Sequence, residues 1–326
     1  MFNFLQTELM QNRNFMRLWM AQIGSAFGSR ITRTVLPMIA IISAGASTTQ
    51  IGIFSVLGVT PGLFIAAFAG GVIDRGNKRI ILIVSDLVRA AAIMAIPISA
   101  WFGLLGINQL YIVITVVGIA SAIFAITDNT YFPTLVIKKH LVHSNSRLEA
   151  TDSIAEATGP GIAGILIQVI TAPFVMVIDA CTYLWSAFML SRIDSPEKPS
   201  EPDPKSAGLF ADAIAGYRIC VGNPTIKSLL IVDTLMNFVG GFSMALYMVL
   251  GLSILNLSPA VLGMVISVGG VGAFVGAIYT SKLSDHFGVR RAMMITLVAG
   301  LLAVLLIPAS MINLEYGVWF SMAPGF

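Results

Sequence analysis

Nine long apolar segments separated by short polar connections dominate this chain. A helix of about 20 apolar residues crosses the hydrocarbon core of a bilayer and satisfies its own backbone hydrogen bonds there. We therefore predict an all-α membrane protein. The expected spans lie near 17–42, 51–73, 80–103, 110–132, 153–171, 174–192, 228–252, 260–282 and 293–311, and a tenth opens around Tyr316.

The composition supports this prediction. Only 11% of the residues are charged and 56% are hydrophobic, whereas a soluble domain carries about 25% charged residues. The first apolar segment contains internal charges and no small-residue cleavage pattern, so we interpret it as a spanning helix and not as a signal peptide.

Patterns typical of enzymes, metal sites and nucleotide sites are missing from the sequence. The two cysteines, Cys181 in an apolar segment and Cys220 beside the polar linker, argue against a disulfide framework. The patterns CxxC, HExxH and GxxxxGK[ST] do not occur. We expect no cofactor, no metal and no ATP-driven pump. A membrane enzyme acting on lipid would need a clustered nucleophile or acid–base set, and the sequence offers none.

Positive charge is distributed asymmetrically. With a cytoplasmic N-terminus, the inner connections hold sixteen of the nineteen Lys and Arg residues and the outer connections hold none. Arg30, Arg33 and Arg89 lie inside spans. Because basic residues stay on the cytoplasmic side, we predict a multi-pass protein of the cell membrane with a cytoplasmic N-terminus.

A polar break divides the spans into two groups. Residues 193–207 hold four prolines and alternating charges, which is typical of a solvated linker. We predict an N-terminal six-helix bundle (1–192), a cytoplasmic linker (193–224) and a C-terminal bundle (225–326). Within the linker, 209–221 has the spacing of an amphipathic helix on the inner membrane face, or alternatively of an extension of the next span.

Two connections share a motif at a constant offset of 211 residues. Asp74 aligns with Asp285 and Arg79 with Arg290. The first copy resembles the loop signature of the major facilitator superfamily, G-x-x-x-D-R-x-G-[RK]-[RK], although Asn77 stands in place of the glycine before the basic pair. The matching positions are Gly70, Asp74, Arg75, Lys78 and Arg79.

The resemblance implies a twelve-span transporter made of two six-helix bundles, so the second bundle is expected to be incomplete. It also implies that the loop is a conformational latch between the bundles. A plain positive-inside loop is the alternative, but it does not explain Asp74 or the repeated spacing.

A second motif lies in the fifth span. Gly159, Pro160, Gly161 and Gly164 resemble the G-P-x-x-G-G element of family exporters, with Ala163 in one glycine position. Segments 135–150 and 179–184 are similar to the branch of macrolide and siderophore exporters. The arginine that many drug–proton exporters carry in span four is absent from 119–123. A generic kinked packing face remains the alternative interpretation of the motif.

Charges inside the spans are the remaining clue to function. An arginine at mid-membrane costs about 2.5–3.5 kcal/mol, so Arg30 and Arg33 are expected to face a wet cavity or an acidic partner. The resemblance places spans one, four and seven around that cavity. The cavity candidates for substrate or proton binding are Arg30, Arg33, Asp128, Asn129, Asp233 and Asn237.

Specific pairings follow from these positions. We hypothesise that Arg30 or Arg33 pairs with Asp128, with a purely structural salt bridge or snorkelling as the alternatives. Asp86 and Arg89 are predicted to form a local ion pair, being three residues apart. Asp152 and Glu156, at the start of the fifth predicted span, are interpreted as helix caps.

The sequence thus predicts a secondary active transporter that exports small amphipathic molecules of the drug, macrolide or siderophore class. Membrane lipid, a small-molecule substrate and protons as coupling ion are the expected partners, and nucleic acid is not. The alternative is a truncated, non-transporting remnant or membrane scaffold. Which substrate is carried does not follow from the sequence.

Overall fold

The computed structural model describes residues 12–137, 140–194, 218 and 220–304. The described residues are helical throughout, apart from the connections. The helices are α2 (Arg13–Ile42), α3 (Thr48–Arg75), α4 (Lys78–Trp101), α5 (Ile107–Leu135), α6 (Leu141–Ile170), α7 (Ala172–Ser191), α9 (Pro224–Val249) continued by the π-helix η2 (Leu250–Ile254), α10 (Pro259–Phe287) and α11 (Val289–Val304).

Each of the nine predicted spans corresponds to one of these helices, which confirms the all-α fold class. The largest difference is at α6, which begins at Leu141 and not near residue 153. Its first turns are polar, so an apolar window misses them, yet they are anchored to the bundle where Trp19 Nε1 donates to Thr151 Oγ1 at 3.0 Å. The predicted tenth span near Tyr316 and nearly all of the predicted linker and surface helix lie outside the described residues.

Four helices among the described residues are long and apolar enough to cross a membrane by length and composition. They are α4, α5, α6 from His143 onward, and α7. Shorter apolar stretches occupy Phe238–Ile254 and Pro259–Gly272. The helices α2 and α3 are comparably long, with 30 and 28 residues.

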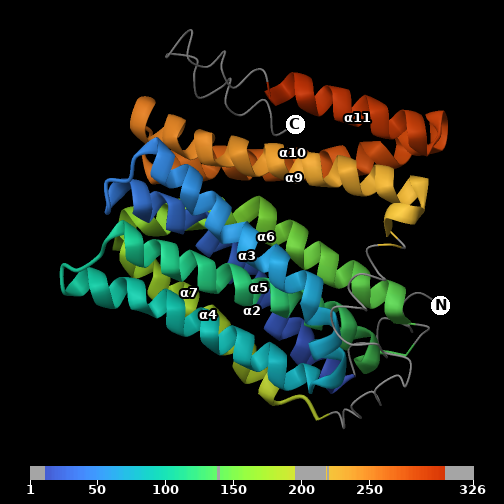
Figure 1. Ribbon diagram of the computed structural model, residues 1–326, viewed down its shortest axis with the longest axis horizontal. Helices are drawn as coiled ribbons and strands as arrows, with labels where there is room; N and C mark the ends of the chain where they lie inside the picture. Colours follow the sequence, from blue (N-terminus) through green and yellow to red (C-terminus); the bar gives the residue numbers. More distant parts are fainter. Residues whose placement is uncertain (1–11, 138–139, 195–217, 219, 305–326) are drawn as a thin grey trace.

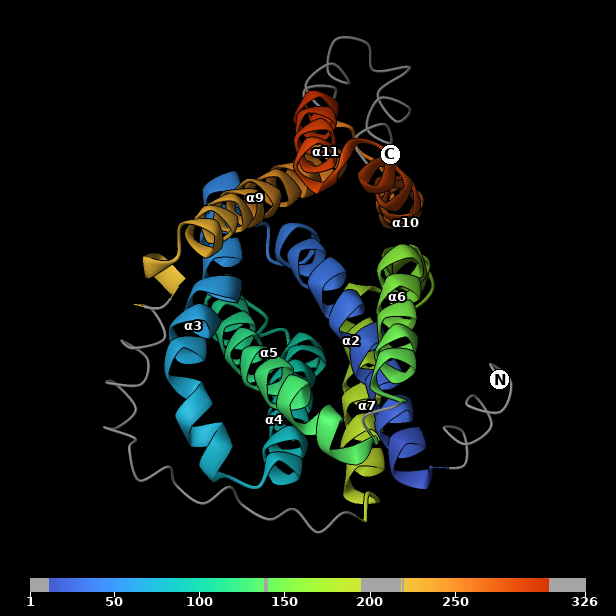
Figure 2. The same ribbon diagram turned by 90° about the vertical axis from the view of Figure 1, so that its right-hand side faces the viewer.

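The helices α2 to α7 form one bundle, and α9, α10 and α11 lie along one side of it (Figure 1). Within the bundle α2 packs against α6 and α7, α4 against α5 and α7, and α3 against α5. Contact with the second group is made mainly by α10 on α6. Figure 2 shows α11 farthest from the bundle, beyond α9 and α10.

One end of the bundle, here called the basic end, is where α2, α4 and α6 begin and where α3, α5 and α7 end. Hydrogen bonds tie these termini together: Asn12 Nδ2 at the start of α2 donates to Leu135 O at the end of α5 at 3.1 Å. Asn12 also caps α2, because its side chain accepts from the backbone N–H groups of Asn14 and Phe15.

Buried apolar side chains form two clusters with a polar layer between them. The smaller cluster lies at the basic end and includes Phe15, Leu18 and Leu190, whereas the larger one includes Val35, Ile93 and further residues of α3, α5, α6 and α7. On α2 the smaller cluster ends at Ala21 and the larger begins at Ile31. The buried charged residues of the bundle lie at this middle level.

Candidate functional site

The first part of the site joins α2 to α5. Gln22 Nε2 donates to Asp128 Oδ2, and the other oxygen of Asp128 is buried without a hydrogen-bond partner among the described residues. Asn129, the next residue on α5, is exposed. Asp128 is therefore held by a neutral amide and not by an arginine.

The second part joins α2 to α6. Arg30 Nη1 pairs with Glu156, and Arg30 Nη2 lies 3.7 Å from Asp152 Oδ1. The hypothesis that Arg30 or Arg33 pairs with Asp128 is therefore wrong. The angular spacing along α2 explains the difference, since Gln22 is directed to α5 while Arg30 is directed to α6.

The interpretation of Asp152 and Glu156 as helix caps is also wrong. Because α6 begins at Leu141 with His140 in the capping position, these carboxylates lie in the interior of the helix. Their side chains remain 58% and 49% exposed. They are thus partly accessible acidic partners of a mid-helix arginine.

Arg33 lies one turn beyond Arg30, on the side away from the basic end. Its side chain is exposed although the residue is inside a long helix. Arg30, Glu156 and Asp152 lie within its electrostatic range. Among the residues that the structure describes, none forms a hydrogen bond or ion pair with Arg33.

A third group of charges is buried between α4 and α7. Arg89 donates to Asp86 Oδ1 of the same helix, which confirms the predicted local pair, and the two side chains are 2% and 0% exposed. The guanidinium carbon of Arg89 lies 4.2 Å from the ring centroid of Phe124 and 4.5 Å from that of Tyr183. These cation–π contacts partly replace the lost hydration of the guanidinium.

Asp179 of α7 extends this buried group toward α2. Its Oδ2 accepts from Thr32 Oγ1, and the hydroxyl of Tyr183 donates to Ser29 Oγ at 3.4 Å. The backbones approach closely here, since a Cβ added at Gly28 would lie 2.9 Å from Asp179 Oδ1. Sequence reasoning noted Asp179 only as part of an exporter-like segment, and the contact with α2 carries no local sequence signal.

The loop motif lies at the basic end. Gly70, Asp74 and Arg75 occupy the last turns of α3, and Lys78 begins α4. Asn77 has φ −76° and its side chain accepts from Ile80 N–H at 3.1 Å, so it is the N-cap of α4. The turn at Asn77 therefore does not need the positive φ that a glycine in this position would allow.

The second copy of the motif spans the end of α10 and the start of α11. Gly288, at the position equivalent to Asn77, has φ +80°, a conformation that favours glycine. The two copies of the motif therefore differ in backbone conformation at this position.

The side chains of several motif and cavity candidates lie outside the described part of the chain, namely Asp74, Arg75, Asp233, Asn237, Asp285 and Arg290.

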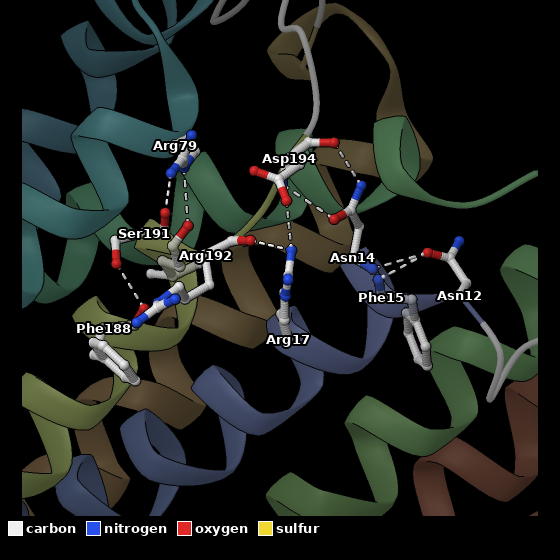
Figure 3. Close-up of polar contacts among 10 residues, drawn as sticks. Asn12, Asn14, Phe15, Arg17, Arg79, Phe188, Ser191, Arg192 and Asp194 are labelled. Carbon is white, nitrogen blue, oxygen red and sulfur yellow. Dashed lines mark hydrogen bonds and ion pairs between the residues drawn. The ribbon is translucent and has the colours of Figure 1, made fainter.

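Arg79 of the loop motif binds the end of α7 (Figure 3). Its guanidinium donates to Leu190 O at 2.9 Å and also to Ser191 O. These carbonyls lack the hydrogen bond from the fourth following residue because α7 ends there, although Leu190 O also accepts from the N–H of Ile193 at 3.2 Å. A cation at a helix C-terminus is also favoured by the helix dipole.

Arg17 of α2 completes this contact, here called the α7 clamp. It donates to Arg192 O and pairs with Asp194 Oδ2 at 3.0 Å. Asn14 forms two further hydrogen bonds with the backbone of Asp194, at 2.9 Å and 3.1 Å. The clamp therefore fixes the point where the chain leaves the six-helix bundle.

The exporter-like motif lies where α6 meets α10. Gly161 N–H donates to Ser267 Oγ at 2.8 Å. A Cβ at Gly164 would lie 3.0 Å from Ala260 Cα, and a Cβ at Gly263 would meet the backbone of Pro160. Close backbone approach of the two helices depends on these small residues. We call this contact the α6–α10 seam.

The described residues contain no group of three or more His, Cys, Asp or Glu side chains that could hold a metal ion. What the geometry offers instead is a set of charged side chains at mid-helix, beside a close-packed seam between two groups of helices. This arrangement is typical of membrane transporters, in which intramembrane charges mark substrate or ion pathways.

Solved transporters share the fold. A bacterial homologue of the iron transporter ferroportin in an inward-facing state matches 96% of this chain and 80% of its own, with a TM-score of 0.68 and 16% identity. The nucleoside transporter NupG matches 95% of this chain and 77% of its own, with a TM-score of 0.69 and 14% identity. At such identities the likeness concerns the fold alone.

The sequence pattern of the Major Facilitator Superfamily matches residues 18–324, and the chain belongs to this family. It is therefore a multi-pass membrane protein of a transporter family. The chain is 26% identical over 289 residues to the multidrug efflux pump Tap of Mycolicibacterium fortuitum, covering 85% of this chain and 69% of Tap. It is 23% identical over 245 residues to macrolide efflux protein A of Streptococcus pyogenes, covering 75% of this chain and 60% of that protein.

Proposed function

We propose that this protein is a secondary active exporter of small amphipathic molecules. The observation that carries the proposal is the charged set Arg30, Arg33, Glu156 and Asp152, which is partly exposed at mid-helix where α2 and α6 face each other. Partly exposed charges at this depth fit a water-filled pathway between helices. The efflux function named for the relatives supports the export direction.

We propose further that the N-terminus is cytoplasmic and that the chain is organised as 1–192, 193–224 and 225–326. In this arrangement the loop motif from Gly70 to Arg79 is a latch at the cytoplasmic side, together with Asp285 and Arg290 of its second copy. The α7 clamp supports part of this role, because it ties Arg79 to the end of the sixth span.

Protons are the proposed coupling ion and Asp128 is the proposed carrier. Its carboxylate is bonded to the neutral Gln22 and keeps one buried oxygen without a partner among the described residues. A carboxylate that lacks a fixed counter-ion can exchange a proton without breaking a salt bridge. Asp128→Asn removes that capacity with little change in shape.

The test measures accumulation of an anionic, a neutral and a cationic amphipathic dye in cells that express the protein from its native locus, with and without a protonophore, and export of any one of them supports the proposal. We expect lower accumulation than in a deletion strain, and expect the difference to vanish with the protonophore. Equal accumulation in both strains would contradict export and favour a scaffold.

Coupling is tested in inverted vesicles with an imposed pH gradient. Asp128→Asn is expected to lower gradient-driven export at least about tenfold, in line with the loss of an interaction of a charged group. The matched control is Glu149→Gln, which neutralises an exposed carboxylate on α6 and is expected to leave export unchanged. Full activity of Asp128→Asn with unchanged pH dependence would contradict the assignment.

A further inference from the structure

Arg33 differs from the other described arginines of the spans, Arg30 and Arg89, in forming no ion pair with any residue that the structure describes. Arg30 is engaged by Glu156 and Asp152, and Arg89 is engaged by Asp86. Arg33 forms no hydrogen bond or ion pair within the described part of the chain, and its side chain is exposed. A guanidinium carries five donors, so this one is available to something outside the polypeptide.

The position of Arg33 on α2 shows which way it faces. Gln22 lies eleven residues earlier, which is about three helical turns at 3.6 residues per turn, so the two side chains share one face. Gln22 contacts α5 and Arg30 contacts α6, so Arg33 faces the space between these helices. Its electrostatic neighbours, Arg30, Glu156 and Asp152, are directed to the same region.

The free energy of placing an arginine in hydrocarbon argues against a lipid-facing position for Arg33. An arginine in contact with hydrocarbon costs about 2.5–3.5 kcal/mol even on the lowest scales. Glu156 and Asp152 act on Arg33 only from a distance, and no hydrogen bond or ion pair among the described residues compensates that cost, whereas water and an anionic ligand would.

The neighbouring charged side chains determine the sign of the electrostatic potential around Arg33. The Arg30 side chain extends toward the basic end and forms ion pairs with Glu156 and Asp152, the two carboxylates of α6. Arg33 lies one turn further from the basic end, so its positive charge is not neutralised by direct contact. The two arginines together leave a positive region on the far side of the carboxylates.

We infer that Arg33 is the anion-binding element of the substrate site, so that the exported molecules carry a carboxylate or phosphate group beside their apolar part. This inference rests on the proposed export function and adds the substrate class to it. A planar guanidinium binds such groups through two parallel hydrogen bonds. Lysine at this position would keep the charge but lose that geometry.

The experiment compares wild type, Arg33→Gln and Arg33→Lys in cells that express the protein from its native locus. Three fluorescent probes are used: fluorescein as the anion, Nile red as the neutral molecule and ethidium as the cation. We expect wild type to export fluorescein, Arg33→Gln to export it at least about tenfold more slowly, and Arg33→Lys to fall between them. Export of Nile red or ethidium, where wild type shows it, is expected to be unchanged.

Arg13→Gln is the matched control, because Arg13 is exposed at the start of α2, twenty residues before Arg33 on the same helix. It should export fluorescein as wild type does. The inference is overturned if Arg33→Gln exports fluorescein normally, or if it loses all three probes equally, which would indicate a structural role.

Two further outcomes separate this inference from the proposed function. If wild type exports Nile red or ethidium but not fluorescein, the substrate class is wrong and the export function stands. If wild type exports none of the three probes, the export function itself is contradicted.

A last experiment distinguishes a soluble anionic substrate from the headgroup of an anionic lipid. Fluorescein transport is measured in phosphatidylcholine vesicles with and without phosphatidylglycerol. Inhibition by the anionic lipid would assign Arg33 to lipid binding and overturn the inference.

Discussion

Arg89 illustrates how a charged residue is accommodated inside the bundle. It is almost completely buried, yet its guanidinium has Asp86 as counter-ion and the faces of Phe124 and Tyr183 on its sides. A second carboxylate, Asp179, lies on the neighbouring helix and accepts from Thr32. Removing the cation would leave two buried carboxylates without a positive partner.

We predict that Arg89→Met lowers the stability of the protein by about 3–5 kcal/mol, the usual cost of leaving a buried charge unpaired. The measurement is the unfolding midpoint in detergent. Arg13→Met is the control, because replacing this exposed arginine at the start of α2 should change stability by less than about 0.5 kcal/mol. Equal midpoints for the two variants would show that the buried pair contributes nothing to stability.

At the scale of elements, helix contacts depend on residues that lack a side chain. The α6–α10 seam brings Gly263 against the backbone of Pro160 and brings Gly164 against Ala260. Pro160 cannot donate a backbone hydrogen bond, and the neighbouring Gly161 N–H donates across the seam to Ser267. The seam joins the two groups of helices, so we expect its packing to affect how they move relative to each other during export.

Gly263→Ala is therefore expected to destabilise the protein by about 1–3 kcal/mol, the usual cost of overpacking a close contact. It should also slow export, because the two backbones can no longer approach. Unfolding midpoints and export rates in the same preparation provide the measurement.

Gly241→Ala on α9 is the matched control. A Cβ at Gly241 meets nothing within 4 Å, and alanine in a helix interior is favoured over glycine by about 0.5–1 kcal/mol. This variant should be neutral or slightly more stable. If both variants behaved alike, the seam would not depend on close approach.

At the scale of the whole molecule, one end of the bundle collects the basic residues. Arg17 and Arg79 lie there and donate hydrogen bonds to carbonyls at the end of α7. They therefore stabilise the fold and also contribute to the charge asymmetry between the two ends of the bundle. Basic connections stay on the cytoplasmic side of a membrane. The proposed orientation of the molecule therefore rests on the same residues that close the bundle.

We predict that a cysteine at position 200, in the linker, reacts with an impermeant maleimide only after the cells are permeabilised. A cysteine at position 108, which is exposed at the start of α5, should react in intact cells. Both variants, Ser200→Cys and Asn108→Cys, require prior replacement of Cys181 and Cys220 by serine. Labelling of position 200 from outside would reverse the topology.

The sequence alone determined the number of the described helices, their places apart from the polar first turns of α6, and the local pair of Asp86 with Arg89. Both depend on short-range patterns: a run of apolar residues long enough for a bilayer, and two charges one turn apart. The loop motif and the seam motif were also visible, because a fixed spacing identifies them without knowledge of their contacts.

Only the tertiary structure decided which charges meet. Arg30 binds Glu156 and not Asp128, and Arg89 lies beside Asp179, although these residues are far apart in the sequence. The rotation of one helix about its axis selects its partner, and that rotation is set by packing against several neighbours at once. A sequence pattern records which face is apolar, whereas the identity of the opposing helix is a property of the assembled bundle.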